Sequence, residues 1–89
     1  MSMNDHTKTV ESRLASVFAE VFSLPPDRVH SDLDPDKVEG WDSLGHVMLI
    51  AAIEAEFSIQ FDVDQIMDFT SFQTVLSVLD KAVHERVAT

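Results

Sequence analysis

The chain has 89 residues, no cysteine and a formal net charge of −10 at pH 7. A chain of this length forms one domain with a simple core, and the lack of cysteine excludes a disulfide framework, a thiolate metal site and a thiol nucleophile. The acidic excess disfavours nucleic acid as a partner, because the phosphate backbone carries the same sign of charge. Nine of the acids lie between residues 31 and 64, against Lys37 alone. A surface of that kind attracts basic protein partners.

The apolar segments of the chain indicate where in the cell the protein is expected. The first residues lack the apolar core of a signal peptide, and the longest apolar run, Val47 to Ile53, is too short to span a bilayer. We therefore expect a cytoplasmic protein with no membrane insertion. Residues 1–89 are expected to form one freestanding domain, with a core over about residues 8–84.

A first helix is predicted from about Thr7 to Phe22, because apolar residues recur there at three- and four-residue steps. They are Val10, Leu14, Val17, Phe18 and Val21. Pro25 and Pro26 end this helix, since a residue before proline is displaced from the helical conformation. Residues 25–42 then read as a long loop, which is unusual in so small a domain and often functional. Its apolar residues, Val29, Leu33, Val38 and Trp41, are expected to hold it against the core.

Three further helices are predicted after the loop. The second runs from about Ser43 to Phe57 and turns Leu49, Ile50, Ile53 and Phe57 inward. The sequence Asp62-Val63-Asp64-Gln65 is a capping box that opens a short helix through Ile66, Met67 and Phe69. Thr70-Ser71-Phe72-Gln73 is another capping box, which starts a last helix with the buried stripe Phe72, Val75, Leu76, Leu79 and Val83. Alternation at Ile59 and Phe61 is compatible with a brief extended stretch, but no partner strand is evident. The predicted fold is an all-α four-helix bundle of three long helices and one short helix.

Ser43 is the reactive group with the best-defined setting in the chain. It follows Gly40-Trp41-Asp42 and stands at the start of an apolar helix. The first turn of a helix exposes unpaired N–H groups and the positive end of the helix dipole, so a phosphodiester on this serine would be stabilised. Gly45 is expected to leave room beside it. A serine at this place is also a common helix cap, and the residues alone leave both interpretations open.

The stretch Gly40-Trp41-Asp42-Ser43-Leu44, with Ile53-Glu54-Ala55-Glu56-Phe57 and Ile59-x-Phe61 after it, resembles the acyl and peptidyl carrier proteins. The resemblance covers about residues 8–84. It implies a four-helix bundle that carries 4′-phosphopantetheine on Ser43, between Asp42 and Leu44, with acyl or aminoacyl cargo held as a thioester. The implied role is carriage for fatty acid, polyketide or nonribosomal peptide biosynthesis, and not catalysis.

The resemblance also implies the partners and the surface that meets them. A phosphopantetheinyl transferase would supply the group from coenzyme A, a loading ligase would add the cargo, and transferases or synthases would remove it from a monomeric carrier. The expected docking residues on the second helix are Val47, Met48, Ala51 and Glu54. Fatty-acid-type carriers commonly have acids at the positions of Gly45, Met48 and Ala55, so docking here is expected to depend more on apolar contacts. The alternative is that Val47 and Met48 are core residues, because the helix is apolar nearly all round.

Two other chemistries are disfavoured by residue spacing. Asp32, Asp34 and Asp36 imitate the start of an EF-hand loop, but Lys37 stands where glycine is required and Ser43 where glutamate belongs, so no metal site is expected. Asp42, Ser43 and His46 contain the residue types of a catalytic triad. Neighbours on one helix rarely reach triad geometry, and a Gly-x-Ser-x-Gly turn is lacking.

The main alternative function is an acidic helical interaction module, without catalysis, in which Ser43 is only a helix cap. Trp41 also has two interpretations. It either anchors the end of the loop against the bundle or contacts the cargo or the transferase, and the burial of a large aromatic ring favours the anchor.

Overall fold

The computed structural model describes residues 6–29 and 32–88. The described chain forms α1 (His6–Phe22), the 3₁₀ helix η1 (Pro26–Arg28), α2 (Ser43–Phe57), α3 (Val63–Met67) and α4 (Phe72–Ala88). No strand occurs in the part that is described, so the predicted all-α fold with four α-helices is confirmed. The predicted single domain also includes residues 1–5, 30, 31 and 89, which lie outside the described residues.

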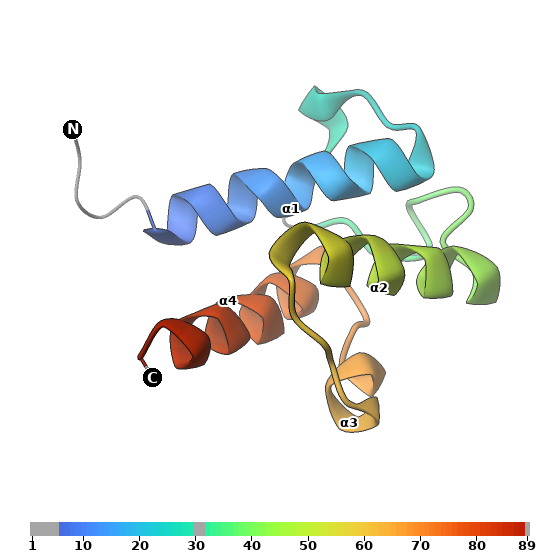
Figure 1. Ribbon diagram of the computed structural model, residues 1–89. Helices are drawn as coiled ribbons and strands as arrows, with labels where there is room; N and C mark the ends of the chain where they lie inside the picture. Colours follow the sequence, from blue (N-terminus) through green and yellow to red (C-terminus); the bar gives the residue numbers. More distant parts are fainter. Residues whose placement is uncertain (1–5, 30–31, 89) are drawn as a thin grey trace.

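The helices surround one shared core. Helix α1 packs against both α2 and α4, while the short α3 stands apart from the long helices in the connection between α2 and α4 (Figure 1). At the centre, the ring of Phe18 lies 4.9 Å from that of Phe72 and 5.2 Å from that of Trp41. The helices contribute the buried residues Val10, Leu14, Val17, Phe18, Leu49, Ile53, Phe57, Phe72, Val75, Leu76 and Leu79. Val21, Ile50 and Val83 are only half-buried at the edge of this core.

The long loop between α1 and α2 is held against the bundle as predicted. Leu33, Val38 and Trp41 are buried, and Val29 packs half-buried against the same core. The carbonyl of Leu33 accepts a hydrogen bond from Phe72 N at 2.9 Å, which ties the loop to the start of α4. The end of the loop therefore has a defined position where it enters α2.

Two predicted helix boundaries are corrected by the hydrogen bonds. The capping box of α3 is confirmed between Asp62 and Gln65, but this helix ends at Met67 and leaves Phe69 buried beyond it. The reciprocal cap of α4 joins Ser71 to Thr74, with Thr74 N donating to Ser71 Oγ and Ser71 N donating to Thr74 Oγ1. The predicted Thr70–Gln73 box is therefore wrong by one residue, because the threonine hydroxyl takes the role expected of the glutamine.

The segment between α2 and α3 is held by a side chain and not by strand pairing. Glu54 Oε2 accepts a hydrogen bond from Phe61 N at 2.9 Å, and the Phe61 ring packs edge-on against Phe69. None of the helices that the structure describes has the length and apolar character that crossing a bilayer requires.

Candidate functional site at the start of α2

Asp42, and not Ser43, caps the second helix. Its backbone is extended, its Oδ1 accepts a hydrogen bond from Gly45 N at 3.0 Å, and its carbonyl accepts one from His46 N at 2.7 Å. Ser43 is the first helical residue, and its side chain is exposed. The interpretation of Ser43 as only a helix cap is wrong, because Asp42 already performs that function.

Gly45 and Gly40 allow the end of the loop to cross the first turn of α2 at backbone contact. Gly45 is buried, and a Cβ added there would lie 1.9 Å from the carbonyl oxygen of Gly40 and 3.1 Å from Phe22 Cε1. Gly40 has φ +96°, a conformation that side chains rarely adopt. The expected free space beside Gly45 is therefore occupied by the loop backbone and by α1. This close approach positions Ser43.

Trp41 anchors the loop next to the serine. Its side chain is 5% exposed and its ring lies 5.8 Å from that of Phe22. Its Nε1–H donates to His46 Nδ1 at 3.0 Å, and the two rings are nearly parallel, with an interplanar angle of 15°. The anchor interpretation of Trp41 is confirmed by this burial. The same hydrogen bond engages His46 Nδ1 with the indole, so this nitrogen does not serve Ser43 as a base.

A hollow of about 390 Å³ opens beside the serine and is lined by Pro35, Trp41, Asp42, Ser43 and His46. We call it the Ser43 hollow. A second hollow of about 260 Å³ lies on the other flank of the first turn, where Phe22 and Met48 are among its lining residues. The exposed hydroxyl thus has open space around it. The N–H groups of Ser43 and Leu44 lie in the first turn and have no partner within the helix. An anionic ester on Ser43 fits this setting.

The exposed side of α2 carries apolar residues. Leu44 is 69% exposed, Val47 62% and Met48 49%, and Ala51 is exposed as well. We call these four residues the apolar strip. The alternative that Val47 and Met48 belong to the core is wrong, because Leu49 and Ile53 occupy the inward side. Glu54 is half-buried and holds Phe61 N, so its carboxylate has a structural contact that the docking prediction did not include.

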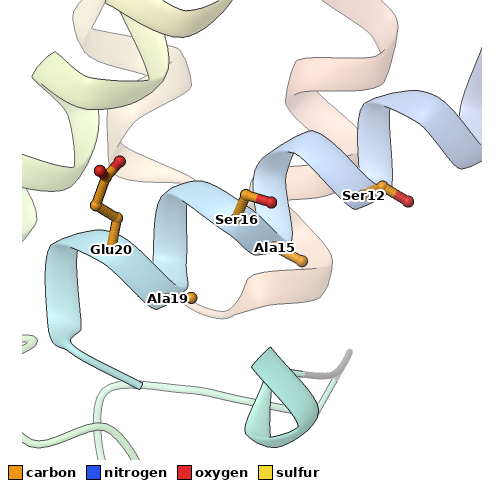
Figure 2. A pocket seen from close by; sticks show the side chains of 5 residues that line it. All are labelled: Ser12, Ala15, Ser16, Ala19 and Glu20. Carbon is orange, nitrogen blue, oxygen red and sulfur yellow. The ribbon is translucent and has the colours of Figure 1, made fainter. Parts of the chain in front are cut away.

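Two features outside the predicted site have no clear signal in the sequence. Val63 and Met67 are large apolar residues of the short helix α3, and they are 70% and 72% exposed. Figure 2 shows five side chains of α1 that line a hollow of about 580 Å³, namely Ser12, Ala15, Ser16, Ala19 and Glu20. None of these five belongs to the Ser43 hollow. Within the described residues, no group of three or more histidine, cysteine or acidic side chains could hold a metal ion.

The comparisons with known proteins identify the family of the chain. Residues 12–79 match the family model described as the phosphopantetheine attachment site. The chain therefore belongs to the family of phosphopantetheine-binding carrier domains, as the sequence resemblance predicts, and a covalently attached 4′-phosphopantetheine is its prosthetic group. Helix α2 and the whole Ser43 hollow lie inside the matched segment.

Two curated relatives are acyl carrier proteins. Acyl carrier protein 3 of Ralstonia nicotianae is 26% identical over 80 residues, which cover 90% of this chain and 92% of the relative. The acyl carrier protein of a Cylindrotheca species is 31% identical over 74 residues, which cover 83% of this chain and 92% of the relative. Both similarities extend over most of the length of each protein, and both relatives are named as acyl carriers.

Proposed function

We propose that Ser43 carries the 4′-phosphopantetheine and that the protein is a monomeric, cytoplasmic carrier of acyl or aminoacyl cargo in a biosynthetic pathway. The observation that carries this proposal is the exposed hydroxyl of Ser43 in the first turn of α2, with the cap supplied by its neighbour Asp42. When it is bound, the group supplies a terminal thiol that holds the cargo as a thioester, which a chain without cysteine cannot provide from its own residues.

The attachment reaction uses the serine as the nucleophile. The Oγ of Ser43 forms a new ester bond to the phosphorus of coenzyme A that bears pantetheine, and the pyrophosphate bond breaks with 3′,5′-ADP as the leaving group. The hydroxyl proton passes to a base on the phosphopantetheinyl transferase. Within the chain, His46 Nδ1 accepts from Trp41 Nε1–H and Asp42 Oδ1 accepts from Gly45 N–H, so both atoms are already engaged. The chain contributes an exposed nucleophile at a rigid position and leaves the catalytic groups to its partner.

The apolar strip is the surface that we propose for docking. Leu44, Val47 and Met48 project from the helix that begins with Ser43, so an enzyme seated on them reaches the serine without displacing the core. The surrounding acids support fast encounter with basic partner surfaces. Once loaded, the tethered cargo meets a docked enzyme at an effective concentration on the order of millimolar. Loading ligases and downstream transferases or synthases would use the same strip in turn.

The test is the intact mass of the protein before and after incubation with coenzyme A and a broad-specificity phosphopantetheinyl transferase. The wild type should gain one phosphopantetheine, and Ser43→Ala should gain none. Ser16→Ala is the matched control, because Ser16 is an exposed serine on α1 outside the Ser43 hollow, and this variant should be modified like the wild type. Modification that persists in Ser43→Ala, or no gain by a folded wild type, would refute the assignment of Ser43.

A further inference from the structure

The hydrogen bond between Trp41 and His46 determines which nitrogen of His46 carries the proton. An indole N–H can only donate, and Trp41 Nε1 lies 3.0 Å from His46 Nδ1. Nδ1 must therefore be the acceptor, so the neutral imidazole bears its proton on Nε2. The stacked indole and the edge-on ring of Phe69, 6.3 Å from the imidazole, hold this orientation.

The remaining donor of His46 is available beside Ser43. His46 follows Ser43 by three residues on one helix, which places both on the same face, and both line the Ser43 hollow. Among the described residues, the imidazole has no hydrogen-bond partner other than Trp41. Its Nε2 has no hydrogen-bond partner among those residues and is not fully buried, so solvent reaches it. The imidazole therefore keeps one solvent-accessible N–H donor, on a side chain that lines the Ser43 hollow.

We propose that His46 is a positioning residue for the prosthetic group, and that its Nε2–H donates a hydrogen bond to a phosphodiester oxygen on Ser43. This inference rests on the proposed attachment at Ser43. A hydrogen bond to an ionised acceptor is shorter and stronger than a neutral one. No cationic side chain lines the hollow, so the neutral N–H donor of His46 supplies the contact that a phosphate needs there.

The contact also determines on which side of α2 the phosphopantetheine arm, the flexible chain attached to Ser43, begins. His46 lies in the Ser43 hollow with Pro35, whereas Met48 and Phe22 line the hollow on the opposite flank. A phosphate held by His46 starts the phosphopantetheine arm in the Ser43 hollow, which neither Leu44 nor Met48 of the apolar strip lines. The apolar strip then stays accessible to a docking enzyme. Trp41 thus acts on the arm through His46, in addition to anchoring the loop.

Two substitutions separate this role from a purely structural one. In His46→Asn the amide oxygen can take the place of Nδ1 and accept from Trp41, but nothing replaces Nε2. In His46→Gln the side chain reaches the place of Nε2 and can donate to the phosphate, but the acceptor for Trp41 is lost. Each variant and the wild type are compared without and with phosphopantetheine, after the modified form is verified by intact mass.

The measurements are the ³¹P chemical shift of the phosphodiester, the ¹⁵N shifts of the His46 imidazole and the thermal midpoint of each form. We expect the wild-type imidazole to carry its proton on Nε2 before modification and the Nε2 resonance to move on modification. The ³¹P shift of His46→Gln should match the wild type, while that of His46→Asn should differ. We expect modification to raise the thermal midpoint of the wild type and of His46→Gln, because the new hydrogen bond stabilises the modified form, and to leave that of His46→Asn unchanged.

The proposal is overturned if modification leaves the wild-type imidazole resonances unchanged, or if all three modified proteins share one ³¹P shift. The wild-type comparison decides the question even where a variant does not fold. These outcomes would leave the attachment to Ser43 intact, since every protein compared has been shown by mass to carry the group. Failure of the wild type to accept the group would instead overturn both proposals at the earlier step.

Discussion

Replacing Gly45 by alanine should destabilise the protein, although alanine is the better helix former. Helix propensity alone predicts a gain of about 1 kcal/mol for this change. The structure predicts the opposite sign, because the new Cβ would lie 1.9 Å from the carbonyl oxygen and 3.0 Å from the carbonyl carbon of Gly40. These are backbone atoms, so the contact cannot be relieved by rotating a side chain. The end of the loop has to move away from α2.

The magnitude follows from these opposing effects. Overpacking of a well-packed interior typically costs about 1–3 kcal/mol, and a clash with backbone atoms, which no side-chain rotation relieves, lies in the upper part of that range, at about 2–3 kcal/mol. After the gain in helix propensity is subtracted, we expect the free energy of unfolding to fall by about 1–2 kcal/mol. In a chain of this size, each kcal/mol lowers the thermal midpoint by about 4–8 °C.

Urea unfolding followed by the fluorescence of Trp41 measures this change, because the indole is buried next to the affected turn. Ala55→Gly is the matched control, since Ala55 is exposed on the same helix and the substitution should lose about 1 kcal/mol through propensity alone. Stability of Gly45→Ala equal to or above the wild type would refute the close approach of Gly40 to α2. We also expect slower modification of Ser43 in this variant, because the shifted loop carries Asp42 with it.

Three other substitutions test the anchor, the Glu54 contact and the apolar strip. Trp41→Ala should lower the free energy of unfolding by about 3–5 kcal/mol, as truncation of a buried aromatic residue does; an unchanged circular-dichroism melt would contradict the anchor role. Glu54→Ala should lose about 1–3 kcal/mol because Phe61 N–H is left without its acceptor, whereas normal stability with slow modification would mean that Glu54 acts only in docking. Met48→Ala should change stability by less than about 0.5 kcal/mol and slow the transferase about fivefold, equivalent to about 1 kcal/mol of lost apolar contact. Val63→Ala, at an exposed residue of α3, is the matched control for that assay.

Most helix boundaries could be predicted because their signals are local. Apolar residues at helical spacing, Pro25 and the Asp62 capping box each act within a few residues of the chain, and α2 has the predicted bounds. The cap of α4 shows the limit of such reasoning. Ser71 and Thr74 form the reciprocal pair, and the standard pattern of a capping box, which ends in glutamate or glutamine, pointed one residue too early.

The inward residues Leu49, Ile53 and Phe57 of α2 were predicted correctly, but the sequence left open whether Val47 and Met48 also belong to the core. Helix α2 is apolar nearly all round, so periodicity does not decide whether these two side chains face the core or solvent. Packing against α1 decided it, burying Leu49 and Ile53 and leaving Val47 and Met48 exposed. The role of Glu54 was missed for a related reason, because its partner Phe61 lies seven residues further on, beyond the end of the helix.

By itself, the sequence determined the all-α fold, the position of Ser43 at the start of a helix and the carrier family, because each depends on short contiguous patterns. Only the tertiary structure decided what surrounds that serine. The packing of Trp41 against Phe18 and Phe22 of α1 joins residues that lie 23 and 19 positions apart in the chain, and Phe22 also lies beside Gly45, 23 positions further on. The tautomer of His46 depends in turn on where that packing places the indole N–H. Contacts between segments so far apart in sequence have no local signature, so they emerge only when the chain has folded.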